Sequence, residues 1–239
     1  SDTFRASETS IIYASNKSMI AKLKGDKDSY YLTFDEIPQS VKDAMVVTED
    51  RDFYKHEGVN FLSTAKAAVM LVESKLRHRD ISRGGSTITQ QLAKNVFLSN
   101  ERSYERKVRE IFIALELEKK YTKDQILEFY INNIYFANGY YGIEAASKGY
   151  FNKSAKDLDL AEAAFLCSIP NRPSLYNPLE HYKNTLKRKS RILKQMLDAD
   201  CITAAEYSDA NYEEIILNPA QALKTQNYMT TYAISCATK

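Results

Sequence analysis

Apolar residues recur at helical spacing along most of the chain, and residues 103–121 give the clearest example. Four large apolar side chains in this segment are separated by three or four positions, the period of one face of an α-helix. They are Tyr104, Val108, Ile111 and Leu115. The spacing predicts a helix that turns this stripe toward the core and places Arg102, Arg106 and Glu110 on a different, polar face.

Proline and glycine divide the chain into a helical part and two flanking segments. All five prolines fall outside residues 39–169, so this interval contains no helix-breaking ring. Six of the seven glycines lie within it and mark the loops between helices. The fold class is therefore mainly α. Helices are predicted near 40–48, 61–79, 86–98, 103–121, 123–136, 142–150, 159–168, 179–198 and 203–210.

Helix-start signals agree with these boundaries. A Ser, Thr or Asp followed three residues later by an acidic residue or Gln has the spacing of a reciprocal N-terminal cap. The pairs are Ser40 with Asp43, Thr122 with Gln125, Ser154 with Asp157, Asp159 with Glu162, and Thr203 with Glu206. Before Pro38 the pattern changes, because short apolar runs at 11–13 and 19–21 flank a polar turn and predict a β-hairpin. Residues 30–32 are a candidate third strand.

Composition narrows the class of protein. The 239 residues suit one large domain, and 33 Lys and Arg against 31 Asp and Glu leave a net charge of only +2. Such a balance argues against a general nucleic-acid binder. Cys167, Cys201 and Cys236 are far apart, which excludes a disulfide framework and a thiolate zinc site. No apolar run reaches the roughly 18 residues of a membrane span, and because the chain starts at Ser1 we expect an excised fragment.

The first polar constellation is the segment EDRDFYKHEG, residues 49–58. Glu49 and Asp50 follow an apolar helical segment and precede Gly58. A carboxylate at a helix end beside apolar groups can have a raised pKa and act as a general base. The alternative is a solvated, charged helix end, and this segment alone does not decide between them.

The second constellation is RGGSTITQQLAKN, residues 83–95. Two glycines lead into a helix whose first turns carry Ser86, Thr87 and Thr89, so backbone N–H groups and hydroxyls converge where an anion can bind. The nucleotide-binding patterns GxxxxGK[ST] and GxGxxG are absent. The alternative is a glycine-hinged loop before a capped helix, and we expect mobility over residues 72–85 without ligand.

The third constellation is a run of charges from Arg102 to Lys120. Arg106 and Glu110 have the spacing of an ordinary surface ion pair, which contributes only a few tenths of a kcal/mol. If Lys94 and Arg102 face a shared cleft, they supply donors for a pyrophosphate, which arginine binds in a bidentate manner and lysine as a point charge.

In this order, the three segments resemble the motifs of peptidoglycan glycosyltransferases, the glycan-polymerising domains of class A penicillin-binding proteins and monofunctional transglycosylases. The segment AEAAFLCSIPNRPSLYNP, residues 161–178, is similar to the part of the family that follows. The resemblance covers about residues 35–210. It implies a lysozyme-like helical large lobe, a smaller membrane-facing jaw lobe and a short N-terminal β-hairpin. It also implies polymerisation of lipid II into β-1,4-linked glycan, with inversion and release of polyprenyl pyrophosphate.

The resemblance also assigns roles. Glu49 would be the base for the acceptor 4-hydroxyl, and Glu110 would assist the leaving pyrophosphate. The remaining substrate-binding candidates are Asp50, Phe53, His56, Gly85, Ser86, Thr87, Gln90, Gln91, Lys94, Asn95, Arg102, Arg106 and Lys107. The resemblance leaves open whether a divalent cation (Mg or Mn) binds at the pyrophosphate, and no protein metal site is predicted. The implied partners are lipid II, the growing lipid-linked chain, the membrane surface on the extracytoplasmic side of the bacterial cell, and moenomycin-type inhibitors.

The implied domain organisation has three parts. They are a hairpin and linker over 1–36, the glycosyltransferase domain over 37–218, and a linker over 219–239 that leads to an absent second domain such as a transpeptidase. The basic stretch 74–80 departs from the family by its length, and it is expected to be a solvated loop or a contact with anionic lipid.

Three other functions compete with the glycosyltransferase. Residues 63–66 match the SxxK pattern of penicillin-reactive serine enzymes, but the SDN and KTG elements that accompany it are absent. A lysozyme-like glycan hydrolase also uses two acids, although it needs no pyrophosphate site. An inactive peptidoglycan-binding module is the third, and the presence of Glu49 and Glu110 argues against it.

Overall fold

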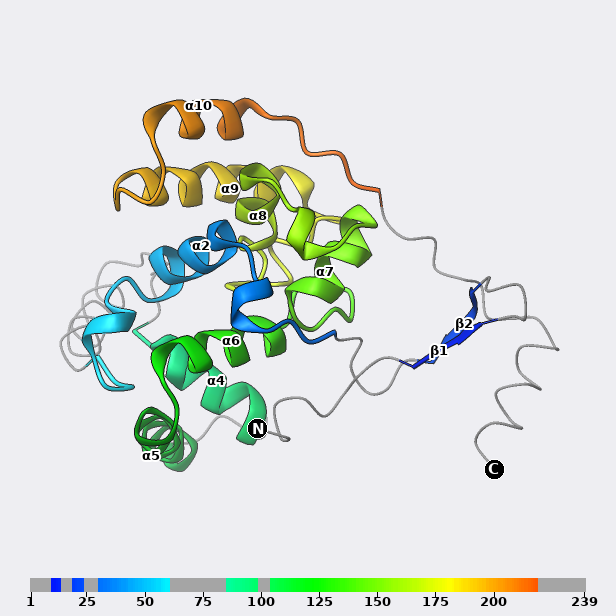
Figure 1. Ribbon diagram of the computed structural model, residues 1–239. Coiled ribbons are helices and arrows are strands. Elements are labelled where there is room, and N and C mark those ends of the chain that lie inside the picture. Colours follow the sequence, from blue (N-terminus) through cyan, green and yellow to red (C-terminus); the bar gives the residue numbers. More distant parts are fainter. Residues whose placement is uncertain (1–9, 14–18, 24–29, 61–84, 99–103, 219–239) are drawn as a thin grey trace.

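The computed structural model describes residues 10–13, 19–23, 30–60, 85–98 and 104–218, and it confirms the mainly helical class (Figure 1). The strands are β1 (Ser10–Tyr13) and β2 (Met19–Leu23), and the 3-10 helices are η1 (Phe34–Glu36), η2 (Phe53–Lys55) and η3 (Ala155–Asp157). The α-helices are α2 (Gln39–Glu49), α4 (Ile88–Phe97), α5 (Tyr104–Lys120), α6 (Lys123–Asn133), α7 (Ile143–Phe151), α8 (Leu160–Leu166), α9 (Tyr182–Leu197) and α10 (Ala204–Tyr212). The predicted helix 61–79, the SxxK match, the basic stretch 74–80, most of the segment 72–85 expected to be mobile, and the linker 219–239 lie outside the described residues.

The N-terminal strands pair as predicted, and the candidate third strand does not form. β1 and β2 are antiparallel, with Ser10 opposite Leu23. Residues 30–32 bind to α6 instead. The Leu32 backbone N–H donates to Asn132 Oδ1 and the Leu32 carbonyl accepts from Asn132 Nδ2, both at 2.8 Å. A side-chain amide of α6 thus takes the two backbone groups that a neighbouring strand would have paired.

Three of the five predicted caps are confirmed as reciprocal pairs. They are Thr122 with Gln125, Asp159 with Glu162, and Thr203 with Glu206. The prediction for Ser40 is wrong because α2 already begins at Gln39, directly after Pro38. The prediction for Ser154 is also wrong as a reciprocal cap, since its hydroxyl accepts from the Lys156 N–H and begins only the three-residue η3.

The helices form two groups around the carboxyl end of α2 and the start of α4. α2 packs against α8 and α9, and α10 packs on α9 and α8 (Figure 1). α4 packs against both α5 and α6. The core includes Met45 of α2, Leu92 of α4, Ile126 of α6 and Met196 of α9, all fully buried. Burial of α2 and α4 on these neighbours fixes the positions of the polar side chains at their ends.

The predicted apolar stripe of α5 is wrong. Val108 is 51% exposed, whereas Glu110 and Ala114 are buried. The reason lies in the segment after η2, which approaches α5 closely at Gly58. A Cβ at Gly58 would lie 2.9 Å from the Ala114 carbonyl oxygen, and its φ of +83° also favours glycine. This close approach turns the Glu110 and Ala114 face inward, which apolar periodicity alone does not reveal.

Candidate functional site

Glu49 ends α2 with a buried carboxylate that faces three other segments. Its side chain is only 6% exposed. Gln91 Nε2 of α4 donates to Oε2 at 3.1 Å, and Asn171 Nδ2 lies 3.4 Å from Oε1. The guanidinium nitrogen Nη2 of Arg188, on α9, is 3.9 Å from the same Oε1. The carboxylate is therefore desolvated and still has donors on both oxygens, as a positioned general base requires.

Tyr130 of α6 fixes the orientation of the Gln91 amide. The Tyr130 hydroxyl donates to Gln91 Oε1 at 3.0 Å, which leaves Nε2 to face Glu49. Burial raises the pKa of Tyr130 well above its usual value, and the nearby Glu49 charge raises it further. The hydroxyl therefore keeps its proton and remains a donor at neutral pH.

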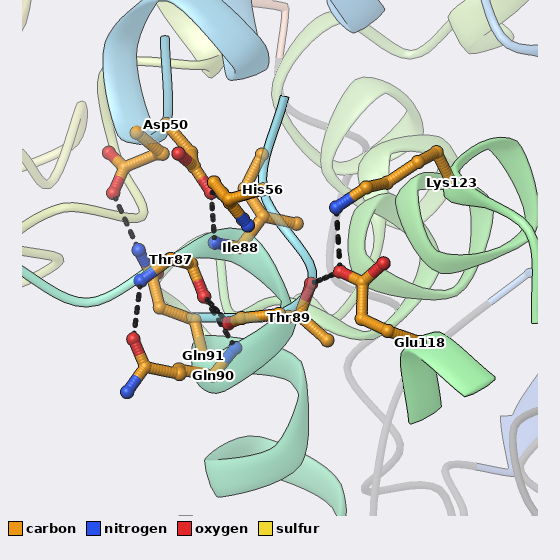
Figure 2. A network of polar contacts seen from close by, with 11 residues as sticks. Asp50, His56, Thr87, Ile88, Thr89, Gln90, Gln91, Glu118 and Lys123 are labelled. Atoms are coloured by element: carbon orange, nitrogen blue, oxygen red, sulfur yellow. Dashed lines mark hydrogen bonds and ion pairs between the residues drawn. The ribbon is translucent and has the colours of Figure 1, made fainter. Parts of the chain in front are cut away.

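Asp50 joins the first predicted segment to the second. Its Oδ2 accepts from the backbone N–H of Ile88 at 3.0 Å and lies 2.9 Å from His56 Nε2 (Figure 2). Ile88 is the first residue of α4, so the carboxylate lies at the positive end of that helix. Asp50 and His56 thus hold the end of α2 and the start of α4 together.

The hydroxyl-rich start of α4 is used largely by the fold itself. Thr87 and Gln90 form a reciprocal cap, with Gln90 N–H donating to Thr87 Oγ1 at 3.1 Å and Thr87 N–H donating to Gln90 Oε1 at 3.0 Å. Thr87 Oγ1 also donates to the Gly58 carbonyl at 2.5 Å. Both side chains are buried. Their polar atoms therefore stabilise the start of α4.

The third segment is tied to the other two through Glu118. Thr89 Oγ1 donates to Glu118 Oε1 at 2.6 Å, and Lys123 Nζ is 2.8 Å from the same oxygen (Figure 2). The Lys123 ammonium also lies 4.5 Å above the ring centre of Phe53, which is fully buried. Phe53, a predicted substrate-binding residue, is therefore part of the core, next to Lys123.

The second acid, Glu110, is linked through Lys107 to Ser86, just before α4. It is buried and bonds to Lys107 Nζ, which also donates to Ser86 Oγ at 3.0 Å. Lys107 remains 42% exposed. The structure thus brings Ser86, Lys107 and Glu110 together. Since Gln91 contacts Glu49, both acids are linked to residues at or next to the first turns of α4.

The remaining predicted residues occupy different surroundings. Lys94 and Asn95 are exposed on α4, and Arg106 is half-buried on α5. Gly85 directly precedes Ser86. Arg102 lies outside the described residues, so its part in the cation cluster stays a prediction.

Sequence reasoning missed three residues around Glu49. Tyr130 lies in a buried helix. Asn171 lies in a segment that carries only the resemblance to the family, and Arg188 lies in a basic run typical of a solvated face. All three lie in segments that follow the three constellations, which is the one feature of the sequence that could have drawn attention to them. No spacing rule links them to Glu49.

Three other features bear on the chemistry. A hollow of about 110 Å³ is lined by residues that include Phe34, Lys42 and Cys201. None of the predicted site residues lines it. Within the described ranges, no three His, Cys, Asp or Glu side chains gather where they can hold a metal ion. Across the same ranges, every helix is too short or too polar to cross a bilayer.

Comparisons with known proteins identify the family of the chain. A family model described as Transglycosylase matches residues 16–197. Penicillin-binding protein 4 of Bacillus subtilis is 42% identical over 212 residues, 88% of this chain and 33% of the relative. Penicillin-binding protein 1A of Pseudomonas aeruginosa is 42% identical over 204 residues, 85% of this chain and 24% of that protein.

A solved structure shows the same fold. The crystal structure of penicillin-binding protein 1A from Haemophilus influenzae matches with a TM-score of 0.55 at 21% identity, over 97% of this chain and 24% of that one. The chain thus spans about a quarter to a third of the length of these proteins. The family model and the sequence relatives lead to one conclusion: the chain belongs to the transglycosylase family.

Proposed function

We propose that this domain is a peptidoglycan glycosyltransferase that polymerises lipid II into β-1,4-linked glycan with inversion. The observation that carries the proposal is that two buried acids are both linked to the start of α4, Glu49 through Gln91 and Glu110 through Lys107 and Ser86. Their nearest donors differ, because Glu49 accepts its shortest hydrogen bond from an amide, with the Arg188 guanidinium at 3.9 Å, whereas Glu110 bonds directly to the ammonium of the partly exposed Lys107. This asymmetry suits a reaction with a hydroxyl on one side and a charged leaving group on the other.

On the acceptor side, Glu49 takes the proton of the sugar 4-hydroxyl as the hydroxyl oxygen attacks C1 of the donor. The bond between C1 and the pyrophosphate oxygen breaks, and the leaving group keeps the electron pair. A sugar hydroxyl is a weak nucleophile at neutral pH, so an oriented, desolvated carboxylate lowers the barrier by general base catalysis. Gln91 and Tyr130 fix that orientation.

On the donor side, Lys107 and Lys94 neutralise the pyrophosphate. The Lys94 side chain is exposed and that of Lys107 partly so, whereas Glu110 is buried and holds Lys107 in place. Positive groups fixed in advance stabilise the charge that develops on the leaving oxygen. Ser86, bonded to Lys107, contributes a hydroxyl at the same place. Arg102 and Arg106 are proposed to extend this cation cluster.

A divalent cation is compatible with the donor side. Magnesium is commonly bound by one or two carboxylates together with substrate phosphates, and Glu110 provides one carboxylate there. The ion would supply further charge neutralisation at the pyrophosphate when bound. The cation stays a proposal, and Lys107 already contributes positive charge at that place.

The proposed setting is the extracytoplasmic face of the bacterial cell membrane, where lipid II and the growing chain are anchored by their lipids. Moenomycin-type phosphoglycolipids are proposed as inhibitors because they present a similar phosphate to the same cations. A transpeptidase domain in the full-length protein is part of the same proposal.

The test is incubation of the domain with lipid II and, separately, with finished glycan strands. Chain growth from lipid II supports the proposal, shortening of finished strands supports a hydrolase, and neither reaction indicates a binding module. A parallel reaction with a chelator tests the divalent cation. Labelled penicillin should leave the domain unmodified, and a covalent adduct at Ser63 would support the serine-enzyme alternative.

A further inference from the structure

The two oxygens of the Glu49 carboxylate have unequal partners. Oε2 accepts a hydrogen bond of ordinary length, 3.1 Å, from Gln91. Among the described residues, Oε1 has longer contacts, 3.4 Å to Asn171 and 3.9 Å to Arg188. A lone pair on Oε1 is therefore less engaged, and this oxygen is the better placed of the two to receive a proton.

Arg188 is held in position independently of Glu49. Its guanidinium carbon lies 5.0 Å from the ring centre of Tyr176, and its side chain is 14% exposed. A guanidinium over an aromatic face is attracted by the ring and keeps its charge at all accessible pH values. The cation near Oε1 therefore remains in place whether or not Glu49 is ionised.

The other titratable groups facing Glu49 do not replace this charge. Burial raises the pKa values of Tyr130 and Cys167 above their usual ranges, so both are neutral at pH 7. Asp50, the next residue, is an acid occupied by His56 and the Ile88 N–H. Removal of the guanidinium would leave Glu49 in a buried site where its ionised form is disfavoured.

We infer that Arg188 is a positioning residue that keeps Glu49 ionised and directs Oε1 toward the acceptor hydroxyl. The inference rests on the proposed function of Glu49 as the base. In the reaction the proton of the acceptor hydroxyl passes to Oε1, while an electron pair of the hydroxyl oxygen forms the new bond to C1 of the donor and the pyrophosphate leaves. Arg188 does not touch the sugar in this scheme and acts only through Glu49.

The test is the pH dependence of kcat/KM for lipid II polymerisation in Arg188→Gln, with Arg191→Gln as the matched control. Arg191 is on the same helix and exposed, so its replacement removes the same charge away from Glu49. Loss of a cation at this distance disfavours the carboxylate, and the acidic limb of the profile should move up by about one unit. Activity below that limb should then fall about tenfold.

Arg188→Lys, which retains a charge, should recover part of the shift, and Arg191→Gln should produce none. Thermal unfolding of each variant checks that the fold is intact. If Arg188→Gln does not fold, Arg188→Met provides the same charge removal with an apolar stem. A lower rate with an unmoved acidic limb, or an equal shift in Arg191→Gln, would overturn the inference while wild-type polymerisation still stands. A wild-type domain that does not polymerise lipid II would overturn the proposed function itself.

Discussion

Asp50 caps the first backbone N–H of α4 from outside the helix, because its Oδ2 accepts from Ile88 across 38 positions of sequence. Asp50→Ala should leave that buried N–H unpaired, together with His56 Nε2, and lower the free energy of unfolding by about 2 kcal/mol. Asp50→Asn keeps an accepting oxygen and should cost less. Urea unfolding measures both. Asp52→Ala is the control, since its pair with Lys55 is exposed; an equal loss there would contradict the capping role.

Glu49→Gln should remove the proton acceptor and reduce kcat for polymerisation by about 10²- to 10⁴-fold. The side-chain oxygen of the replacement still accepts from Gln91, so the fold and affinity for a phosphoglycolipid inhibitor should be retained. Rates with lipid II and calorimetric binding measure the two effects separately. Glu116→Gln, an exposed change on α5, serves as the control. Near-normal turnover of Glu49→Gln would refute the assignment of the base.

Gln91→Ala should lower kcat by about ten- to a hundredfold, because small losses of orientation at a reacting group are costly. It removes the donor to Glu49 and also the acceptor of the buried Tyr130 hydroxyl. Gln39→Ala removes an exposed amide at the opposite end of α2 and should leave kcat unchanged. If both variants behave alike, Gln91 does not orient the base.

Lys123→Met should destabilise the protein by about 3 kcal/mol, because it leaves Glu118 charged and largely buried without its cation. The double variant Lys123→Met, Glu118→Leu should recover much of that loss. Chemical unfolding of the two single variants and the double variant gives the coupling. Lys119→Met breaks an exposed pair and should change stability by less than about 1 kcal/mol. Additive effects of the two buried changes would contradict the coupling.

Glu36 should contribute to the acid sensitivity of the fold. Its bond to Lys156, with help from Thr33, lowers the pKa of this carboxyl from 4.5 to about 2. A lowered folded-state pKa stabilises the protein above pH 4.5, and that stabilisation is lost as the pH falls toward 2. Glu36→Gln should therefore flatten the decline of unfolding free energy over this interval. Asp157→Asn, on the same turn as Lys156, is the control, and an unchanged slope in Glu36→Gln would contradict the assignment.

Much of the fold followed from local signals. The start of α10 was predictable because Thr203 and Glu206 form a cap from side chains within one turn. The stripe of α5 was not, because its inward face depends on the distant Gly58 and its approach to Ala114. Local spacing records the period of a helix, but the partner of each face is set by tertiary packing.

The site shows the same division. Glu49 and Gln91 were predicted from chemically suggestive segments, and the structure places them in contact. Arg188 approaches Glu49 only because α9 packs on α2, and no pattern within α9 indicates that contact. Thr87 was expected to face a ligand, and its polar atoms are used by the helix cap because a buried helix start must satisfy its own N–H groups.

The oxygen that Glu118 shares between Thr89 and Lys123 has an evolutionary consequence. Loss of Glu118 leaves the Thr89 hydroxyl and the Lys123 charge unmatched, and loss of Lys123 leaves the buried Glu118 carboxylate without its cation, so single replacements at these two positions should be disfavoured and compensated ones tolerated. Among diverging copies of this domain, the two positions should drift as a correlated pair, even though they are not neighbours in sequence.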